Sequence, residues 1–119
     1  MAAGMPISAS NTLHYNWGAE DNPCDGWHLV GTPEFSVILE RMPPGTSEVR
    51  HYHERVRQFF FVLEGELRIE IGNEEFVLSP QQGIEIDPKV RHQAFNCSSE
   101  DVRFLVISQP PSHGDRVIE

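Results

Sequence analysis

The 119-residue sequence predicts an all-β protein whose antiparallel strands form a sandwich or a barrel. From Trp27 onward, short apolar runs recur about every eight to twelve residues, a spacing typical of such folds. Nine Pro and nine Gly residues punctuate the chain and favour turns between these runs. No helical periodicity competes with this pattern, so a helical fold is not expected.

The predicted strands are short segments of apolar or alternating residues. In chain order they are residues 27–30, 34–41, 49–53, 59–63, 66–71, 75–78, 83–86, 92–96 and 103–108. Turn-prone sequences separate them, namely Pro43-Pro44-Gly45, Glu64-Gly65, Gly72-Asn73, Ser79-Pro80 and Asp87-Pro88. Of these, Gly72-Asn73 favours a tight hairpin between segments 66–71 and 75–78.

The length of the chain suits one domain with a single hydrophobic core. Residues 1–22 are polar and predict an N-terminal arm with at most one short strand, and residues 23–108 hold the strands of the barrel. The C-terminal tail, residues 109–119, cannot continue the last strand because it contains Pro110 and Pro111. It either folds across the mouth of the barrel, as a lid or a dimer arm, or lies on the surface.

The charge of the chain limits its partners. A formal net charge of −9 argues against nucleic acid, which requires a basic face, and against an anionic membrane surface. The N-terminal residues have neither the basic start nor the apolar run of a signal peptide, and the longest apolar run, 59–63, is too short to cross a bilayer. We expect a cytoplasmic protein with reduced thiols that binds a small molecule or another protein.

His51, Tyr52 and His53 form an H-x-H triplet within a predicted strand. Successive side chains of a strand point to opposite faces, so the two imidazoles lie on one face, roughly 6–7 Å apart. Imidazole is the commonest protein ligand for divalent transition metals, and this spacing lets two rings converge on one ion. Two histidines at this spacing also occur by chance in ordinary cores, so the triplet alone does not define a metal site.

Other residues lie at fixed distances from the triplet: Gly45, Gln58 and Gly65 around it, and His92 and Asn96 in a later apolar stretch. This pattern resembles the two motifs of the cupin superfamily, G-x5-H-x-H-x3,4-E-x6-G and G-x5-P-x-G-x2-H-x3-N. The first motif matches at every position except one, where Gln58 replaces the Glu. In the second motif only His92 and Asn96 match, and the residues at its Gly, Pro and Gly positions are Gln81, Asp87 and Lys89.

The resemblance implies an antiparallel double-stranded β-helix, that is, a jelly-roll barrel with its site in the lumen. It also implies that His51, His53 and His92 are ligands of one divalent transition metal, with Gln58 at the place of a fourth ligand. The ligand set suits Zn, Fe, Ni, Co and Mn alike. Asn96 is expected to form hydrogen bonds rather than to ligate the metal.

Gln58 changes the charge of the implied site. Without the carboxylate, the site keeps the full charge of the divalent ion, which makes it a stronger Lewis acid and holds the ion less tightly. Gln58 either ligates weakly through its carbonyl, hydrogen-bonds a bound water or leaves an open coordination position. His113, in the tail, is a further candidate ligand, although a surface tail is the simpler interpretation.

Strand parity indicates which side chains contact a ligand in the lumen. Phe60 and Val62 share a face with Gln58, and we expect both to line a mostly apolar substrate pocket. Glu40 lies in a neighbouring predicted strand. It is a substrate-binding carboxylate or general base if its face is the lumenal one, and a solvated or Arg-paired side chain otherwise.

The opposite face of segment 59–63 is also apolar. It carries Phe59, Phe61 and Leu63, which must be covered from outside by a second sheet or by a partner chain. We therefore expect a homodimer.

Two classes of function remain open from the sequence. The first is a metal-dependent enzyme acting on a small organic substrate: a dioxygenase with Fe, Ni or Mn, or an isomerase or cyclase in which Zn polarises a carbonyl. The second is a non-catalytic cupin module that senses or sequesters a small ligand. We favour the enzyme, and the missing carboxylate at Gln58 keeps the second interpretation open.

Overall fold

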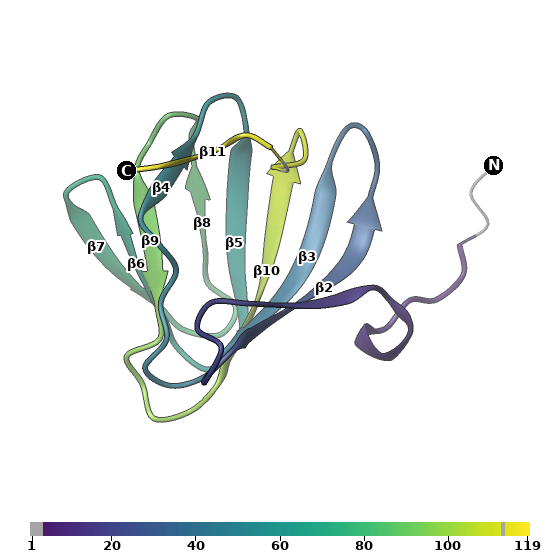
Figure 1. Cartoon of the computed structure of the whole chain (residues 1–119), viewed down its shortest axis with the longest axis horizontal. Coiled ribbons are helices and arrows are strands. Elements are labelled where there is room, and N and C mark those ends of the chain that lie inside the picture. The colour runs from purple at the N-terminus through teal and green to yellow at the C-terminus, as the bar shows by residue number, and fades with distance from the viewer. Residues whose placement is uncertain (1–3, 113) are drawn as a thin grey trace.

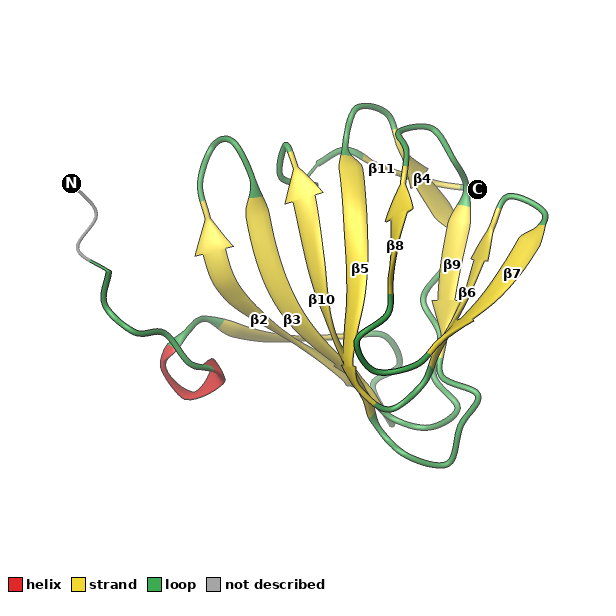
Figure 2. Cartoon of the chain, turned by 180° about the vertical axis from the view of Figure 1, so that it is seen from behind, coloured by secondary structure: helices red, strands yellow, loops and turns green. Residues whose placement is uncertain are grey.

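Two antiparallel sheets face each other around one core (Figures 1 and 2). The computed structural model describes residues 4–112 and 114–119, and these contain one short 3₁₀ helix, η1 (Ala9–Asn11), besides strands. One sheet has the order β1-β2-β3-β10-β5-β8 and the other β11-β4-β9-β6-β7. The strands are β1 (His14–Trp17), β2 (Cys24–Gly31), β3 (Ser36–Met42), β4 (His51–His53), β5 (Arg57–Glu64), β6 (Leu67–Ile71), β7 (Glu74–Leu78), β8 (Gly83–Ile86), β9 (His92–Phe95), β10 (Val102–Gln109) and β11 (Arg116–Ile118).

The predicted all-β barrel and each of its nine predicted strands are confirmed. The structure adds β1 and β11. β1 pairs with β2 from His14 opposite Trp27 to Trp17 opposite Cys24, so the sheet begins inside the segment predicted as an arm. Both added strands have only three or four residues, too few for an alternating pattern to stand out in the sequence.

The core fills the space between the two sheets. Phe60 and Phe104 stack with ring centroids 5.7 Å apart, and Phe60 also meets His92 edge-on at 6.2 Å. The largest fully buried apolar side chains are Phe104, Met42, Leu67, Ile69, Val56, Val62 and Val102. Close packing of this kind holds the strands, and with them the histidines, in fixed positions.

Two glycines of the first motif occupy turns. Gly65 has φ +82°, and a Cβ at this position would lie 2.4 Å from the carbonyl oxygen of Asp101, so a side chain does not fit there. Gly45 has φ +80° and donates a backbone hydrogen bond to the Asn96 carbonyl at 2.8 Å. The side chain of Asn96 donates to the carbonyls of Met42 and Glu100, both at 2.8 Å, which confirms its predicted hydrogen-bonding role.

The second motif departs from the family at two positions where the backbone is left-handed. Gln81 has φ +72° and Lys89 has φ +70°, the only residues other than glycine with positive φ in the described chain. The motif places glycine at both positions, and left-handed backbone favours glycine because it has no Cβ. Both turns therefore adopt left-handed backbone at a residue that carries a Cβ.

The C-terminal tail returns across one end of the barrel, and β11 pairs with β4 (Figure 1). The carboxylate of Asp115 accepts hydrogen bonds from the backbone N–H groups of Arg55 and Val56, at 3.0 and 3.2 Å. Glu119 forms ion pairs with Arg50 and with Arg91, at 2.5 and 3.2 Å. The tail is therefore fixed to the strand that carries the H-x-H triplet. His113 lies outside the described residues.

Among the described residues, none forms a helix of the length and apolar character that crossing a membrane requires.

Candidate metal centre

Three buried histidines meet inside the barrel. His51 and His53 project inward from β4, and His92 lies on β9 directly opposite His51. Their exposed fractions are 4%, 5% and 1%, and one nitrogen from each ring lies within 4.8 Å of the others. The H-x-H spacing thus places two rings on one face, and strand pairing supplies the third.

Hydrogen bonds fix the orientation of two of these rings. Nδ1 of His51 donates to the carbonyl of Val49 at 2.7 Å, and Nδ1 of His92 donates to that of Val90 at 3.0 Å. Each bond leaves the lone pair of Nε2 free, which is how metal-binding histidines are usually held. Nε2 of His92 and Nδ1 of His53 are buried and have no hydrogen-bond partner among the described residues.

Burial also keeps the three imidazole rings neutral, the form that binds metals. It lowers the pKa of His51 to about 3 and that of His92 to about 4, and it lowers the pKa of His53 as well. The nearby Arg116 guanidinium adds to the effect on all three. The imidazoles are therefore neutral at pH 7, the protonation state that metal ligation requires.

Gln58 faces the lumen from β5, as predicted, and is 6% exposed. Its Nε2 donates to Oγ of Ser108 on β10 at 3.0 Å. This bond fixes the amide, and its Oε1 is buried without a partner among the described residues. An amide oxygen in this state fits either a weak metal contact or a hydrogen bond from water.

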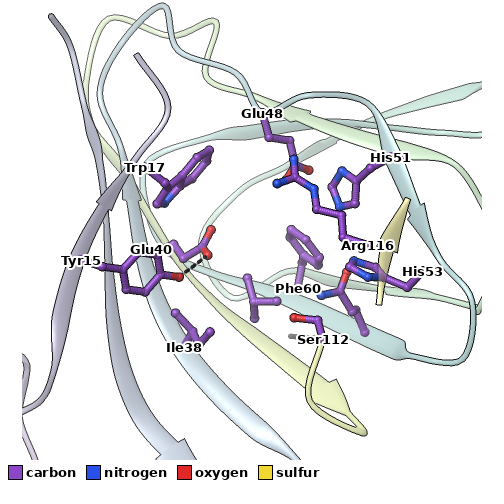
Figure 3. Close-up of a pocket in the computed structure, with 12 residues that line it drawn as sticks. Tyr15, Trp17, Ile38, Glu40, Glu48, His51, His53, Phe60, Ser112 and Arg116 are labelled. Atoms are coloured by element: carbon purple, nitrogen blue, oxygen red, sulfur yellow. Dashed lines mark hydrogen bonds between the residues drawn. The ribbon is translucent and has the colours of Figure 1, made fainter. Parts of the chain in front are cut away.

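A cavity of about 190 Å³ opens beside the histidines (Figure 3). His51, His53, Gln58 and Phe60 form part of its wall, whereas His92 is not among the residues that line it. Glu40 lies on the inner face of β3 and also lines the cavity, so its face is the lumenal one. Val62 was expected in this wall as well, but it is two residues further along β5 than Phe60 and lies fully within the core.

Two carboxylic side chains lie on the cavity wall. Oη of Tyr15 donates to Glu40 at 3.4 Å (Figure 3). The backbone N–H of Ala94 donates to Glu48 at 2.9 Å. Burial raises the pKa of Glu40 to about 7 and that of Glu48 to about 8, and the charge of Glu40 adds to the shift of Glu48. Burial and the Glu40 carboxylate also raise the pKa of Tyr15. Groups that titrate near pH 7 can exchange protons with a ligand.

Sequence reasoning missed several residues of the cavity wall: Tyr15, Trp17, Glu48, Ser112 and Arg116. Tyr15 and Trp17 belong to β1, whose short alternation of aromatic and polar residues was the available signal. Glu48 precedes β4 in irregular backbone, where strand parity does not apply. Arg116 reaches the cavity only because β11 pairs with β4, which no local pattern predicts.

The cupin domain family matches residues 38–108, a range that includes the three histidines and Gln58. The chain belongs to the cupin family. This confirms the resemblance drawn from the two motifs.

A protein of known name is similar in sequence to part of this chain. Polyketide synthase CurC of Streptomyces cyaneus is 32% identical over 81 residues, which cover 68% of this chain and 53% of CurC. The cupin chain described here therefore spans about half the length of that relative.

Solved structures share the fold. A sugar phosphate isomerase of the cupin superfamily from Silicibacter pomeroyi superposes with a TM-score of 0.76 at 24% identity, over 88% of this chain and 75% of that chain. A predicted oxalate decarboxylase from Thermotoga maritima superposes with a TM-score of 0.80 at 18% identity, over 89% and 99% of the two chains. At these identities the likeness shows a common fold.

Proposed function

We propose that this cupin is a metal-dependent enzyme that acts on a small organic substrate in the lumen of its barrel. The observation that carries the proposal is the group of three buried, neutral histidines beside a cavity. The unpartnered acceptors on His53, His92 and Gln58 fit a bound cation, because buried lone pairs without donors are otherwise costly.

His51, His53 and His92 are the proposed ligands, and Gln58 is proposed to contact the ion weakly or to hold a water beside it. When bound, the metal supplies Lewis acidity in the case of Zn, and dioxygen chemistry in the case of Fe, Ni or Mn. The neutral amide of Gln58 leaves the charge of the ion less compensated, which favours the Lewis-acid role of an isomerase or cyclase.

The remaining residues bind the substrate and move protons. Phe60 forms an apolar wall against which a carbon skeleton can pack. Glu40 is proposed as the general base, because its pKa of about 7 allows it to accept and return a proton near neutral pH. Tyr15, hydrogen-bonded to Glu40, orients that carboxylate.

The names of the relatives are consistent with a small organic substrate. CurC is a polyketide synthase, and one structural neighbour is a sugar phosphate isomerase. These names support a small organic molecule as the class of substrate for this chain.

A depletion assay tests the proposal. Protein loaded with Zn²⁺ or Fe²⁺ is incubated with a bacterial metabolite extract, and mass spectrometry follows each small molecule. We expect consumption of a substrate and formation of a product by the loaded wild type, and neither with His53→Ala. If a molecule is retained by the protein and stabilises it without any product, the non-catalytic binding module replaces the enzyme.

We further propose a homodimer and a cytoplasmic location. On the outer face of β5, Phe59 and Leu63 remain 37% and 38% exposed, and Phe59 stacks with Phe61 at a centroid distance of 6.1 Å. A second copy of the chain would remove this apolar face from water.

A further inference from the structure

Arg116 is the one residue with a permanent positive charge among the described residues of the cavity wall. Its side chain extends from β11 into the cavity toward Glu48 and His51 (Figure 3). Its backbone lies directly opposite His53 in the β11–β4 pair. The guanidinium is therefore presented beside the proposed metal ligands.

The guanidinium of Arg116 has no hydrogen bond or ion pair within residues 4–112 and 114–119. Six other arginines of these ranges form ion pairs: Arg41, Arg50, Arg55, Arg57, Arg68 and Arg91. The remaining one, Arg103, lies over the Trp27 ring on the outside of the barrel. Glu40 and Glu48 share the cavity with Arg116 but neither approaches it within 4.0 Å.

The backbone around Arg116 is held firmly although the residue is near the C-terminus. Asp115 binds the N–H groups of Arg55 and Val56, and Glu119 is bound by Arg50 and Arg91. Because this backbone is already fixed, only the exposed side chain of Arg116 has to be ordered when a ligand binds.

A second cavity, of about 470 Å³, adjoins the first and shares Tyr15, Ile38 and Ser112 with it. It follows the inner face of β3 from Ile38 to Ser36, and Pro111 of the tail also lines it. No Lys, Arg, Asp or Glu is among the described residues of its wall. This space suits the apolar part of a ligand whose polar end lies near the histidines.

We propose that Arg116 binds the carboxylate of an amphipathic carboxylic acid whose apolar body lies in the second cavity. A guanidinium binds a carboxylate through two parallel hydrogen bonds. A single negative charge is favoured over a phosphate dianion, because the described residues of the cavity wall include one arginine beside two acidic side chains. The proposal names the substrate class of the proposed enzyme and rests on that function, although Arg116 can bind a carboxylate without the metal.

Calorimetric titration with three probes tests this proposal: cinnamate, its neutral amide cinnamamide, and acetate. Each is titrated into metal-free and Zn²⁺-loaded protein. We expect cinnamate to bind at least about tenfold more tightly than cinnamamide, because hydrogen bonds to a charged group are stronger than neutral ones. Acetate, which lacks the apolar body, is expected to bind at least about tenfold more weakly than cinnamate.

Substitutions test whether Arg116 causes the preference for cinnamate over cinnamamide. Arg116→Gln is expected to bind cinnamate and cinnamamide equally, and Arg116→Lys to keep part of the difference, since it retains the charge but not the planar fork. Arg103→Gln removes the same charge on the outside of the barrel and is expected to behave as wild type. Thermal unfolding of each variant verifies that it is folded.

The results distinguish failure of carboxylate binding by Arg116 from failure of the proposed metal-dependent function. Equal binding of cinnamate and cinnamamide by wild type, no binding of cinnamate, or an unchanged preference in Arg116→Gln would overturn the role of Arg116, even if Zn²⁺ binds. A preference that depends on Arg116 in protein that takes up no metal would support the carboxylate site while the metal-dependent function fails.

Discussion

Three buried polar atoms at the site have no hydrogen-bond partner among the described residues: Nε2 of His92, Nδ1 of His53 and Oε1 of Gln58. Leaving one such atom unpaired costs on the order of 1–3 kcal/mol, so three in one place are a heavy cost for a small domain. Histidines kept only for packing would be expected to use both ring nitrogens. The proposed cation would account for these three atoms, because it accepts their lone pairs in place of a hydrogen-bond donor.

Gln58→Glu is expected to tighten metal binding, because it adds a negative charge where the family carries its carboxylate. The expected gain in Zn²⁺ affinity is at least about tenfold, since opposite charges a few ångströms apart attract by several kcal/mol at the dielectric of a protein site. Competition titration against a chelator measures it. Gln109→Glu, with the same charge change at an exposed position, serves as control. An unchanged affinity would place Gln58 away from the ion.

Glu40→Gln is expected to stabilise the metal-free protein at high pH only. Folding raises the pKa of Glu40 from about 4.5 to about 7, so the folded state disfavours the ionised carboxylate. The wild type therefore loses stability as pH rises through this range, by about 2–3 kcal/mol, and the neutral Gln does not.

Urea unfolding with EDTA at pH 5 and pH 8 measures this difference. The free energy of unfolding of Glu40→Gln should equal that of wild type at pH 5 and exceed it at pH 8. Glu64→Gln, at an exposed position on β5, should change little at either pH. If the free energies of unfolding of Glu40→Gln and wild type differed by the same amount at both pH values, Glu40 would not be desolvated in the folded protein.

Lys89→Gly is expected to raise the free energy of unfolding by about 0.5–1 kcal/mol. Lys89 has φ +70°, a conformation that costs less for glycine than for residues with a Cβ. Glu54→Gly is the matched control in an exposed loop without positive φ, and it should leave stability unchanged or lower it. Equal destabilisation by both substitutions, measured by urea unfolding, would contradict the interpretation of this turn.

At the scale of strands, alternation accounts for much of the site. β4 buries His51 and His53 and leaves Tyr52 half-buried, and β5 buries Gln58, Phe60 and Val62. These inward faces follow from the sequence because every second residue of a strand shares a face. β11 is different: its place depends on Asp115 and Glu119 finding partners far away in the chain.

Phe59→Asp is expected to convert a dimer into monomers, because it places a charge in the centre of the apolar outer face of β5. Sedimentation velocity measures the change. Val77→Asp, at an exposed position on β7 of the other sheet, should leave the association state unchanged. A wild type that sediments as a monomer would contradict the proposed dimer.

At the scale of the whole molecule, strand parity predicted that His51 and His53 share a face, and the resemblance of the two motifs to those of the cupin superfamily implied the barrel and the convergence of His92 with them. It did not predict the cavity wall built by Tyr15, Glu48 and Arg116. These side chains reach the lumen through sheet edges and irregular backbone, which depend on contacts between distant segments. For Glu48 and Arg116 these contacts leave no local pattern in a single sequence, and for Tyr15 the pattern is limited to the four residues of β1.

Elemental analysis of untagged protein tests the central claim most directly, with the double variant His51→Ala/His53→Ala as control. We predict close to one transition-metal ion per chain in the wild type and none in the variant, and the identity of the ion will distinguish dioxygen chemistry from Lewis-acid chemistry. Absence of metal from the wild type, even after loading with Zn²⁺ and Fe²⁺, would contradict the metal centre and favour the non-catalytic binding module.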